Sequence, residues 1–344
     1  MPEFYDGSKL LSMMDINGNK PEIYMCTTNR SGGKTTWFNR YCVKRFINYG
    51  EKFMLLQRFN YELEDCADKF FKDIERLFFQ GHVMTERRRA KGIFYELILD
   101  GNVCGYAVAL NNADQLKKYS HFFSDTVRMV MDEFQSETNH YCGDEVKKFR
   151  SIHTSVARGN GAQSRYLPVY MLSNPVTLLN PYYVAMGVST RLTDNVNFLR
   201  GTGWVLEQGY VDSASKAQQE SAFNSAFSGD NYDVYLTQAV YLNDSSAFIE
   251  TPTGSSRYLG TIRYLGKEYA LREFPNQGVI YCDDRPDATC RVKMALTTDD
   301  HRVNYVMLNQ FRLFVENMRY YFDRGAFRFK NLICKEVILK MLSY

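Results

Sequence analysis

The stretch Ile23-Tyr24-Met25-Cys26-Thr27-Thr28-Asn29-Arg30-Ser31-Gly32-Gly33-Lys34-Thr35-Thr36 decides the fold of this 344-residue chain. Its apolar beginning is typical of a buried strand. Its end matches the phosphate-loop pattern G-x-x-x-x-G-K followed by Ser or Thr, with Thr28 in place of the first glycine. In such a loop, backbone N–H groups turn towards a phosphate, the lysine reaches the β- and γ-phosphates, and the threonine hydroxyl joins a magnesium shell. The sequence therefore predicts an ATP or GTP site with Mg²⁺, formed by Ser31, Gly32, Gly33, Lys34, Thr35 and Thr36.

Two later apolar strands also end in polar residues that suit nucleotide chemistry. One ends in Asp132 and Glu133, and the next ends in Ser173 and Asn174. In phosphate-loop enzymes an aspartate at the first position holds the magnesium hydration shell, and the glutamate after it polarises the attacking water. A polar residue at the second position can sense the γ-phosphate. Because ligands bind at the carboxyl ends of strands in open α/β sheets, the three strand ends together predict nucleotide hydrolysis.

The composition is typical of a soluble globular protein, with 45% apolar and 24% charged residues. No apolar run approaches the roughly 18 residues of a membrane span, and no signal peptide is expected at the start of the chain. The eight cysteines show no zinc-binding spacing and are expected to be reduced. A net charge of +3 does not decide whether the chain binds nucleic acid, because phosphate contacts need only a local cluster of Lys and Arg.

The order of the predicted elements favours an α/β fold with two domains. In the first half, strands alternate with helices over 34–48 and 62–79, which predicts a mostly parallel sheet. Residues 212–227 are polar and small and predict a helical lid or connector. Short strands follow at 234–241, 246–250, 257–265, 268–273 and 278–283, and then helices at 303–323 and after Asn331. We therefore expect a P-loop ATPase domain over 1–195, a lid or linker over 196–229 and a smaller α+β domain over 230–344.

With these features the chain resembles the DNA-packaging (encapsidation) ATPases of small podophages of the salasvirus type, which are relatives of the terminase large subunits. The resemblance runs nearly end to end. The residues that carry it are Phe4-Tyr5, the phosphate loop with Arg30 inside it, residues 45–53, Arg58, Glu62-Leu63, Asp132-Glu133-Phe134, residues 155–158, Leu172-Ser173-Asn174, Asn180-Pro181-Tyr182 and residues 296–300.

The resemblance implies a RecA-like (ASCE) ATPase domain followed by an RNase H-like domain. It further implies a ring motor, usually a pentamer, that hydrolyses ATP with Mg²⁺ and threads double-stranded DNA into a procapsid at its portal. A packaging RNA is a further candidate partner, and no membrane is involved. Such a protein would act in the host cell cytoplasm and transiently on the procapsid.

The resemblance also implies roles for individual residues. Lys34, Thr35, Asp132 and Glu133 match the family's catalytic positions, and Thr35 and Asp132 would hold the metal. Arg158 aligns with the family's arginine finger, which is offered across the subunit interface to the γ-phosphate of the neighbour. Arg30 would contact the phosphates of its own subunit.

Several alternatives stay open at this stage. Arg165 is a second candidate for the finger, Ser173 and Asn174 could simply cap a strand, and Arg58 could be structural. The basic run at residues 86–92 is expected in a turn, and Lys117-Lys118 in another loop. Both could face DNA in a pore or be ordinary solvated charges.

The second domain leaves one functional choice. A nuclease of the terminase type needs several acids to hold two metals. The available acids are Asp233, Asp283, Asp284, Asp299 and Asp300. The resemblance implies a degenerate, inactive domain that serves assembly, contacting the portal and the packaging RNA. The alternatives are a terminase with an active nuclease, and a nucleotide-dependent assembly switch without sustained turnover.

Overall fold

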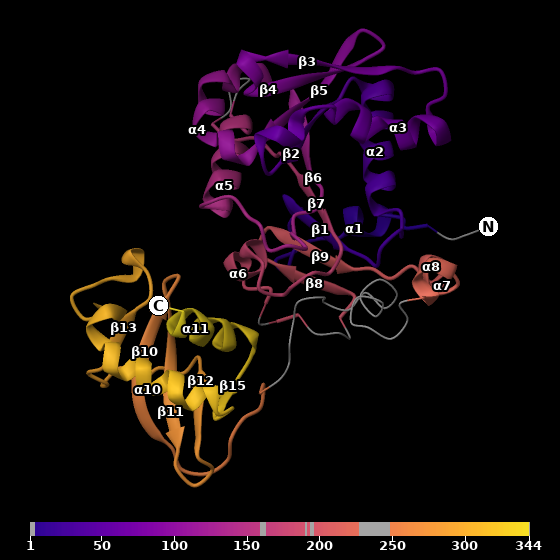
Figure 1. Cartoon of the computed structure of the whole chain (residues 1–344). Helices are drawn as coiled ribbons and strands as arrows, with labels where there is room; N and C mark the ends of the chain where they lie inside the picture. Colours follow the sequence, from indigo (N-terminus) through magenta and orange to yellow (C-terminus); the bar gives the residue numbers. More distant parts are fainter. Residues whose placement is uncertain (1–3, 159–162, 190, 193–195, 227–247, 344) are drawn as a thin grey trace. The chain divides into compact units, whose positions relative to one another are not determined.

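The computed structural model describes residues 4–158, 163–189, 191–192, 196–226 and 248–343, which form two compact units (Figure 1). The division falls between residues 243 and 244, outside the described residues. The strand expected at 234–241 also lies outside them. None of the described helices combines the length and apolar character that a membrane span requires.

The described strands of the first unit form one nine-stranded sheet. Its strand order is β3-β4-β5-β2-β6-β7-β1-β9-β8. The strands are β1 (Ile23–Thr27), β2 (Lys52–Gln57), β3 (Met84–Arg89), β4 (Phe94–Leu99), β5 (Asn102–Ala109), β6 (Thr126–Met131), β7 (Val169–Ser173), β8 (Phe198–Gly201) and β9 (Trp204–Gln208). In the order of the sheet, neighbouring strands from β5 through β2, β6, β7 and β1 to β9 are parallel. The hairpins at both edges are antiparallel. The expected mostly parallel α/β sheet is confirmed.

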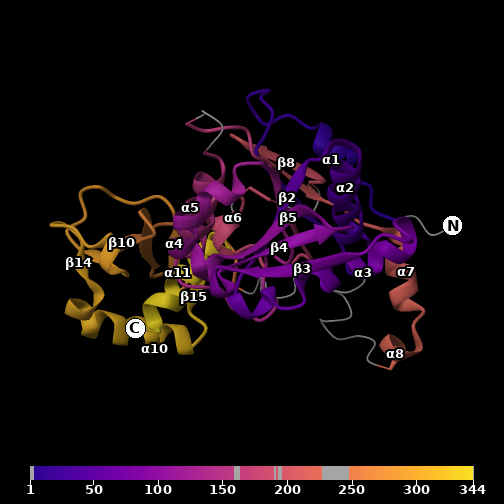
Figure 2. The ribbon, with the colours of Figure 1, turned by 90° about the horizontal axis from the view of Figure 1, so that it is seen from above.

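Helices cover both faces of this sheet, as Figures 1 and 2 show. One face carries α1 (Ser8–Ser12), α2 (Lys34–Tyr49), α3 (Cys66–Phe78) and α7 (Asp212–Gln219), and the other carries α4 (Ala113–Leu116), α5 (Glu145–Val156) and α6 (Pro181–Met186). Neighbouring residues of one strand belong to hydrophobic cores on opposite faces of the sheet. Tyr24 and Cys26 pack with α2, whereas Met25 packs with α5 and α6. Because both faces are buried, the central strands are apolar without alternation.

Two expectations for the first unit are wrong. The segment 196–229 begins with strands β8 and β9 rather than a helical connector, because the apolar residues of β9 are buried beside β1. Helices α7 and α8 (Ala222–Ser225) follow only after them. The basic run at 86–92 lies on the edge strand β3 and the 3-10 helix η2 (Ala90–Gly92), not in a turn, and Lys117 begins the 3-10 helix η4 (Lys117–Phe123).

Strand β3 can carry charge because each of its charged side chains has a partner or faces solvent. The Glu86 carboxylate accepts hydrogen bonds from the backbone N–H groups of Asp65 and Ala67 at the start of α3 (3.2 and 2.9 Å). Arg87 and Arg89 lie on either side of the buried Glu96, at 2.6 and 3.3 Å. Charged residues on an edge strand also discourage pairing with another chain. The run is thus accounted for by the fold.

The described strands of the second unit form a six-stranded mixed sheet of order β14-β13-β10-β11-β12-β15. Its strands are β10 (Arg257–Tyr264), β11 (Lys267–Phe274), β12 (Val279–Asp283), β13 (Lys293–Ala295), β14 (Val306–Met307) and β15 (Phe327–Phe329), and its helices are α10 (Arg312–Asp323) and α11 (Leu332–Leu342). The expected second, smaller α+β fold is confirmed. The helix expected at 303–323 begins only at Arg312, because a turn that buries Tyr305, strand β14 and the 3-10 helix η6 (Leu308–Phe311) come first.

Candidate functional site

The phosphate loop connects β1 to α2. Its backbone favours glycine at Gly33 and leaves little room for a side chain at Gly32. Gly33 precedes α2 with a φ of +90°, in the left-handed region that side chains rarely adopt. A side chain at Gly32 would lie 3.1 Å from both the Thr28 hydroxyl and the Val211 side chain. Thr28 itself is fully buried, and its hydroxyl donates to the Asn29 carbonyl oxygen at 3.0 Å. Threonine therefore fits where the first glycine usually lies.

The loop is held by neighbours that are distant in sequence. The Asn29 side chain is buried and exchanges two hydrogen bonds with the backbone of Val211 (3.0 and 2.9 Å). The Tyr5 backbone N–H donates to the Gly32 carbonyl oxygen at 2.9 Å, and Gln218 donates to the Ser31 hydroxyl at 3.0 Å. Sequence reasoning missed Asn29 and Val211, because a pairing across 182 residues leaves no local pattern.

The structure brings the three predicted strand ends together. Lys34, which is buried, donates from Nζ to Oδ1 of Asn174 at 2.7 Å, so the tips of β1 and β7 meet. Burial lowers the pKa of Lys34, and the nearby Asp132 opposes that shift. Burial raises the pKa of Asp132, while Lys34 and a hydrogen bond with Thr35 act in the opposite direction. Lys34, Thr35, Asp132 and Asn174 thus form one cluster at the carboxyl edge of the sheet.

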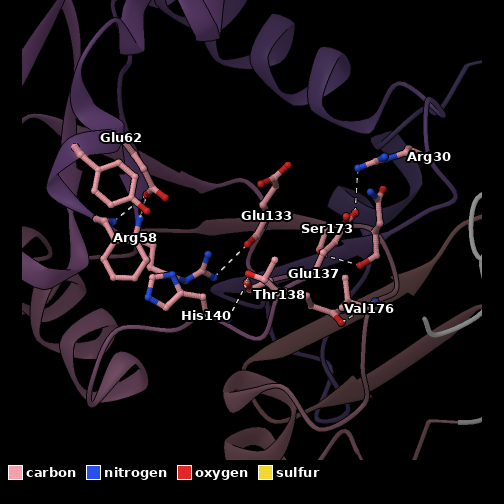
Figure 3. A pocket seen from close by; sticks show the side chains of 14 residues that line it. Arg30, Arg58, Glu62, Glu133, Glu137, Thr138, His140, Ser173 and Val176 are labelled. Carbon is pink, nitrogen blue, oxygen red and sulfur yellow. Dashed lines mark hydrogen bonds and ion pairs between the residues drawn. The ribbon is translucent and has the colours of Figure 1, made fainter. Parts of the chain in front are cut away.

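Glu133 follows Asp132 in an uncommon backbone conformation. Its φ is +54°, a value that few residues other than glycine adopt and that is often found at functional sites. Its backbone N–H donates to Oδ1 of Asp132 at 3.0 Å. Partial burial raises the pKa of Glu133, and the charges of Asp132 and Glu137 raise it further. Its side chain is partly shielded by the protein but reaches solvent, and it points away from Arg58 in Figure 3.

Arg58 holds the main chain around Glu133. Its Nη2 donates to the carbonyl oxygens of Glu133 (3.2 Å) and Phe134 (3.1 Å). Its Nε donates to both oxygens of Glu145, at 3.1 and 3.0 Å. Glu145 is 3% exposed and also accepts from Tyr182 Oη at 3.0 Å. The structure favours the structural alternative for Arg58.

Glu145 was missed by sequence reasoning. It is the first residue of α5, where an acidic residue is common near the helix N-terminus, so its sequence position gives no sign of burial. Besides Arg58 and Tyr182, it accepts the backbone N–H of Cys142 at 2.9 Å. Its partners come from the residue after β2, from α6 and from the segment before α5, which only the fold brings together.

A cavity of about 250 Å³ opens beside the cluster (Figure 3). Its lining includes Glu133, Ser173, Asn174 and Arg30. Arg30 forms an ion pair with Glu137, 3.1 Å from Nη2 to Oε1. The Ser173 hydroxyl donates to the Asn174 carbonyl oxygen at 2.6 Å, which leaves the Asn174 side chain to Lys34. The cavity therefore combines a cation from the phosphate loop with the carboxylate of Glu133.

Arg158 does not line this cavity. It is exposed, two residues beyond the end of α5, and within the described ranges it forms no ion pair. It lines a different cavity of about 450 Å³, together with Lys117, Lys147 and Arg150. Arg165 has a different environment: its guanidinium is partly buried, and Nη2 donates to the carbonyl oxygens of Val156 and Phe123.

The acids of the second unit are engaged in structural contacts. Asp283 pairs with Arg272 at 2.9 Å, and Asp284 pairs with Lys330. Asp300 is buried and accepts the backbone N–H groups of the β10–β11 turn, at 2.9 and 2.7 Å. Asp299 is exposed, and Asp233 lies outside the described residues. Over the parts of the chain that the structure covers, no three His, Cys, Asp or Glu side chains gather so as to hold a metal ion.

Comparison with known proteins gives matches along the whole chain. The model of a family described as podovirus DNA encapsidation protein (Gp16) matches residues 3–343. The DNA packaging protein of Bacillus phage phi29 is 25% identical over 342 residues, which are 98% of this chain and 96% of that protein.

Two solved structures share the fold. One is that of the bacteriophage phi29 viral genome packaging motor assembly, with a TM-score of 0.69 and 24% identity over 98% of this chain and 99% of that one. The other is that of the phi28 gp11 DNA packaging motor, with a TM-score of 0.64 and 14% identity over 100% of this chain and 99% of that one. At these identities, the two structures establish the two-unit fold and nothing finer.

Proposed function

The chain belongs to the podovirus DNA encapsidation protein family, and on that premise we propose that it is an ATP-hydrolysing motor that drives double-stranded DNA into a phage procapsid. One observation carries the proposal. Lys34, Asp132 and Asn174 meet at the carboxyl ends of three neighbouring parallel strands, and Glu133 stands at the adjacent cavity. Phosphate-loop ATPases need this arrangement for their chemistry.

The phosphate loop binds the nucleotide in this mechanism. Its N–H groups and the start of α2 attract the phosphates, and Lys34 supplies positive charge to the β- and γ-phosphates. Asn174 already orients the Lys34 ammonium. When the nucleotide binds, the γ-phosphate can therefore accept a hydrogen bond from a lysine that is in position. Asn174 then senses whether the γ-phosphate is present. Arg30 reaches the same phosphates from within the loop by leaving Glu137.

Thr35 and Asp132 would hold Mg²⁺. Their side chains are hydrogen-bonded to each other, and a hydroxyl with one carboxylate is a usual protein contribution to a magnesium site that also uses phosphates and waters. When bound, the ion would supply positive charge that offsets the negative charge of the phosphates.

Glu133 orients the attacking water and accepts its proton. Its raised pKa brings its basicity closer to neutral pH, which favours a general base. Arg58 donates hydrogen bonds to the carbonyl oxygens of Glu133 and Phe134 and so stabilises the unusual backbone conformation at Glu133. The side chain remains free to face the cavity.

Arg158 acts on the site of a neighbouring subunit. Arg158 is exposed, is not part of the lining of the cavity beside Glu133 and lies in a basic surface cavity, and these features support a role outside its own site. An arginine that meets the γ-phosphate in the transition state is worth about 10³–10⁵ in rate. A finger supplied in trans requires a ring, which we propose to be a pentamer at the portal in the host cytoplasm, with a packaging RNA as a further partner.

The second unit serves assembly in this proposal and does not cut DNA. Asp283, Asp284 and Asp300 are already committed to basic side chains or to a turn. Two-metal cleavage needs acids that are free to bind metal.

Steady-state ATP hydrolysis by the procapsid-bound protein, with and without double-stranded DNA, tests the proposal. We expect DNA-stimulated turnover, abolished by Glu133→Gln but not by Glu64→Gln, which changes an exposed glutamate elsewhere. The DNA should stay intact on an agarose gel. Full turnover in Glu133→Gln would remove the residue from its role, and nicked or linearised DNA would favour the nuclease-bearing terminase. Nucleotide binding without turnover in the wild type would favour the assembly switch.

A further inference from the structure

Two arginines flank the segment that follows α5, and they differ in what they contact. Arg158 is exposed and lines the basic cavity with Lys117. The Arg165 guanidinium is directed at main-chain oxygens of its own subunit, those of Val156 (2.9 Å) and Phe123 (3.4 Å). Nη2 of Arg165 is therefore engaged by the main chain of its own subunit.

The contacts of Arg165 lie next to Arg158 in the chain. Its backbone N–H donates to the Ala157 carbonyl oxygen at 3.0 Å, and Nη2 donates to that of Val156. The last carbonyls of a helix have no partner within the helix, and an arginine there also interacts favourably with the helix dipole. Arg165 thus satisfies the end of α5 and fixes the two residues before Arg158.

The third contact joins α5 to a second element of the basic cavity. Phe123, whose carbonyl oxygen accepts from Nη2, ends the 3-10 helix η4, and Lys117 of the same cavity begins it. A guanidinium presents several donors in a rigid plane and can reach two carbonyls from different elements, which a lysine ammonium on a flexible stem does less well.

We propose that Arg165 is a positioning residue for Arg158. Its hydrogen bonds connect the end of α5 to η4, so that the Arg158 side chain extends from the surface at a fixed position and in a fixed direction. The proposal rests on the finger role of Arg158 proposed above. Since misplacement of a reacting group by about 1 Å can cost about 10²-fold in rate, loss of Arg165 should slow hydrolysis without weakening nucleotide binding.

Mixed rings on the procapsid test this proposal. Arg165→Met keeps the apolar stem and removes the donors, and Arg76→Met makes the same change at an exposed arginine on α3. We expect Arg165→Met alone to lower kcat by up to about 10²-fold with an unchanged Kd for a fluorescent ATP analogue. Arg76→Met should match the wild type.

The decisive readout is complementation. Glu133→Gln subunits lack a working site but keep a correctly held finger, so mixing them with Arg165→Met subunits should restore activity, as mixing them with Arg158→Ala should. Mixing Arg165→Met with Arg158→Ala should restore none, because both fail to supply the finger. Arg165→Lys should show the same pattern with a smaller loss, and it replaces Arg165→Met if that variant does not fold.

Three results would overturn the proposal. Wild-type turnover in Arg165→Met would show that the contacts are dispensable. Rescue of Arg158→Ala but not of Arg165→Met by Glu133→Gln would show that Arg165 supports its own site or the general fold. Failure of Arg158→Ala itself to be rescued would remove the trans finger from the proposed function, and the positioning role would fall with it.

Discussion

Strands β6 and β12 both end in two adjacent aspartate or glutamate residues, yet the two pairs have opposite surroundings. After β6, Glu133 faces a cavity and Asp132 lies beside it in the chain. Burial raises the pKa of both, and the charge of Asp132 raises that of Glu133 further. Asp283 and Asp284 at the end of β12 are paired with Arg272 and Lys330. An acidic pair at a strand end is therefore a functional signal when one of its carboxylates, here that of Glu133, faces a cavity rather than a basic side chain or a backbone turn.

Glu145 extends this comparison within the first unit. Its hydrogen-bonding capacity is already used, because its carboxylate accepts hydrogen bonds from Arg58, from Tyr182 and from a backbone N–H. Glu145→Gln should lower the free energy of unfolding of the first unit by about 3–5 kcal/mol, since it leaves Arg58 buried without its counter-charge. Tryptophan fluorescence in urea measures this effect, because Trp37 and Trp204, the two tryptophans of the chain, lie in the first unit.

Glu64→Gln, at an exposed position, is the control for that measurement and should leave the unfolding curve unchanged. An unfolding midpoint in Glu145→Gln equal to that of the control would mean that the buried ion pair contributes nothing. The distinction between acids that have basic or backbone partners and acids that face a cavity would then lose its clearest example.

The lysines beside the two acidic pairs should differ as the acids do. Lys34→Ala should reduce ATP turnover by about 10²–10³-fold, because a preorganised cation is lost from the phosphates. Lys330→Ala, which removes the partner of Asp284, should leave turnover unchanged. Steady-state hydrolysis by the two variants measures the contrast, and an equal loss in both would contradict it.

Asp300 should matter for stability alone. Asp300→Asn replaces one of the two acceptor oxygens by an amino group. Either the Gly266 N–H, or the Leu265 N–H and the Thr297 hydroxyl, then lose their acceptor, at a cost of about 1–3 kcal/mol. The far-UV circular dichroism transition of the second unit should move to lower urea while tryptophan fluorescence does not. A fall in ATP turnover at full folding would show instead that Asp300 takes part in the chemistry.

The smallest expected effect concerns pH. The acid limb of the rate profile should lie above the range of an ordinary carboxyl, because the pKa of Glu133 is raised and its base form is lost as pH falls through that value. Glu137→Gln removes one of the negative charges that raise this pKa, so the limb should move to lower pH. A pH–rate profile of kcat measures the shift, and movement to higher pH would be contrary to the assignment.

The sequence was sufficient where the chemistry is local. The phosphate loop and the acids after β6 follow from residues that are adjacent in the chain, and so does the parallel sheet. It was insufficient where a residue is defined by a distant partner: Arg58 and Glu145 are 87 residues apart, and Asn29 and Val211 are 182 apart. The charged strand β3 was missed because its charges are paired across the sheet edge, which hides the expected apolar alternation.

Helix α5 connects two places that the sequence keeps apart. Its 12 residues make a rod of about 18 Å. Glu145, at one end, is bonded through Arg58 to the main chain of Glu133, and Arg158 follows the other end. If the helix moves as a rigid body, a shift of Glu145 would also displace Arg158. In the ring that we propose, this helix would connect the support of Glu133 in one subunit to the arginine that the same subunit offers to its neighbour.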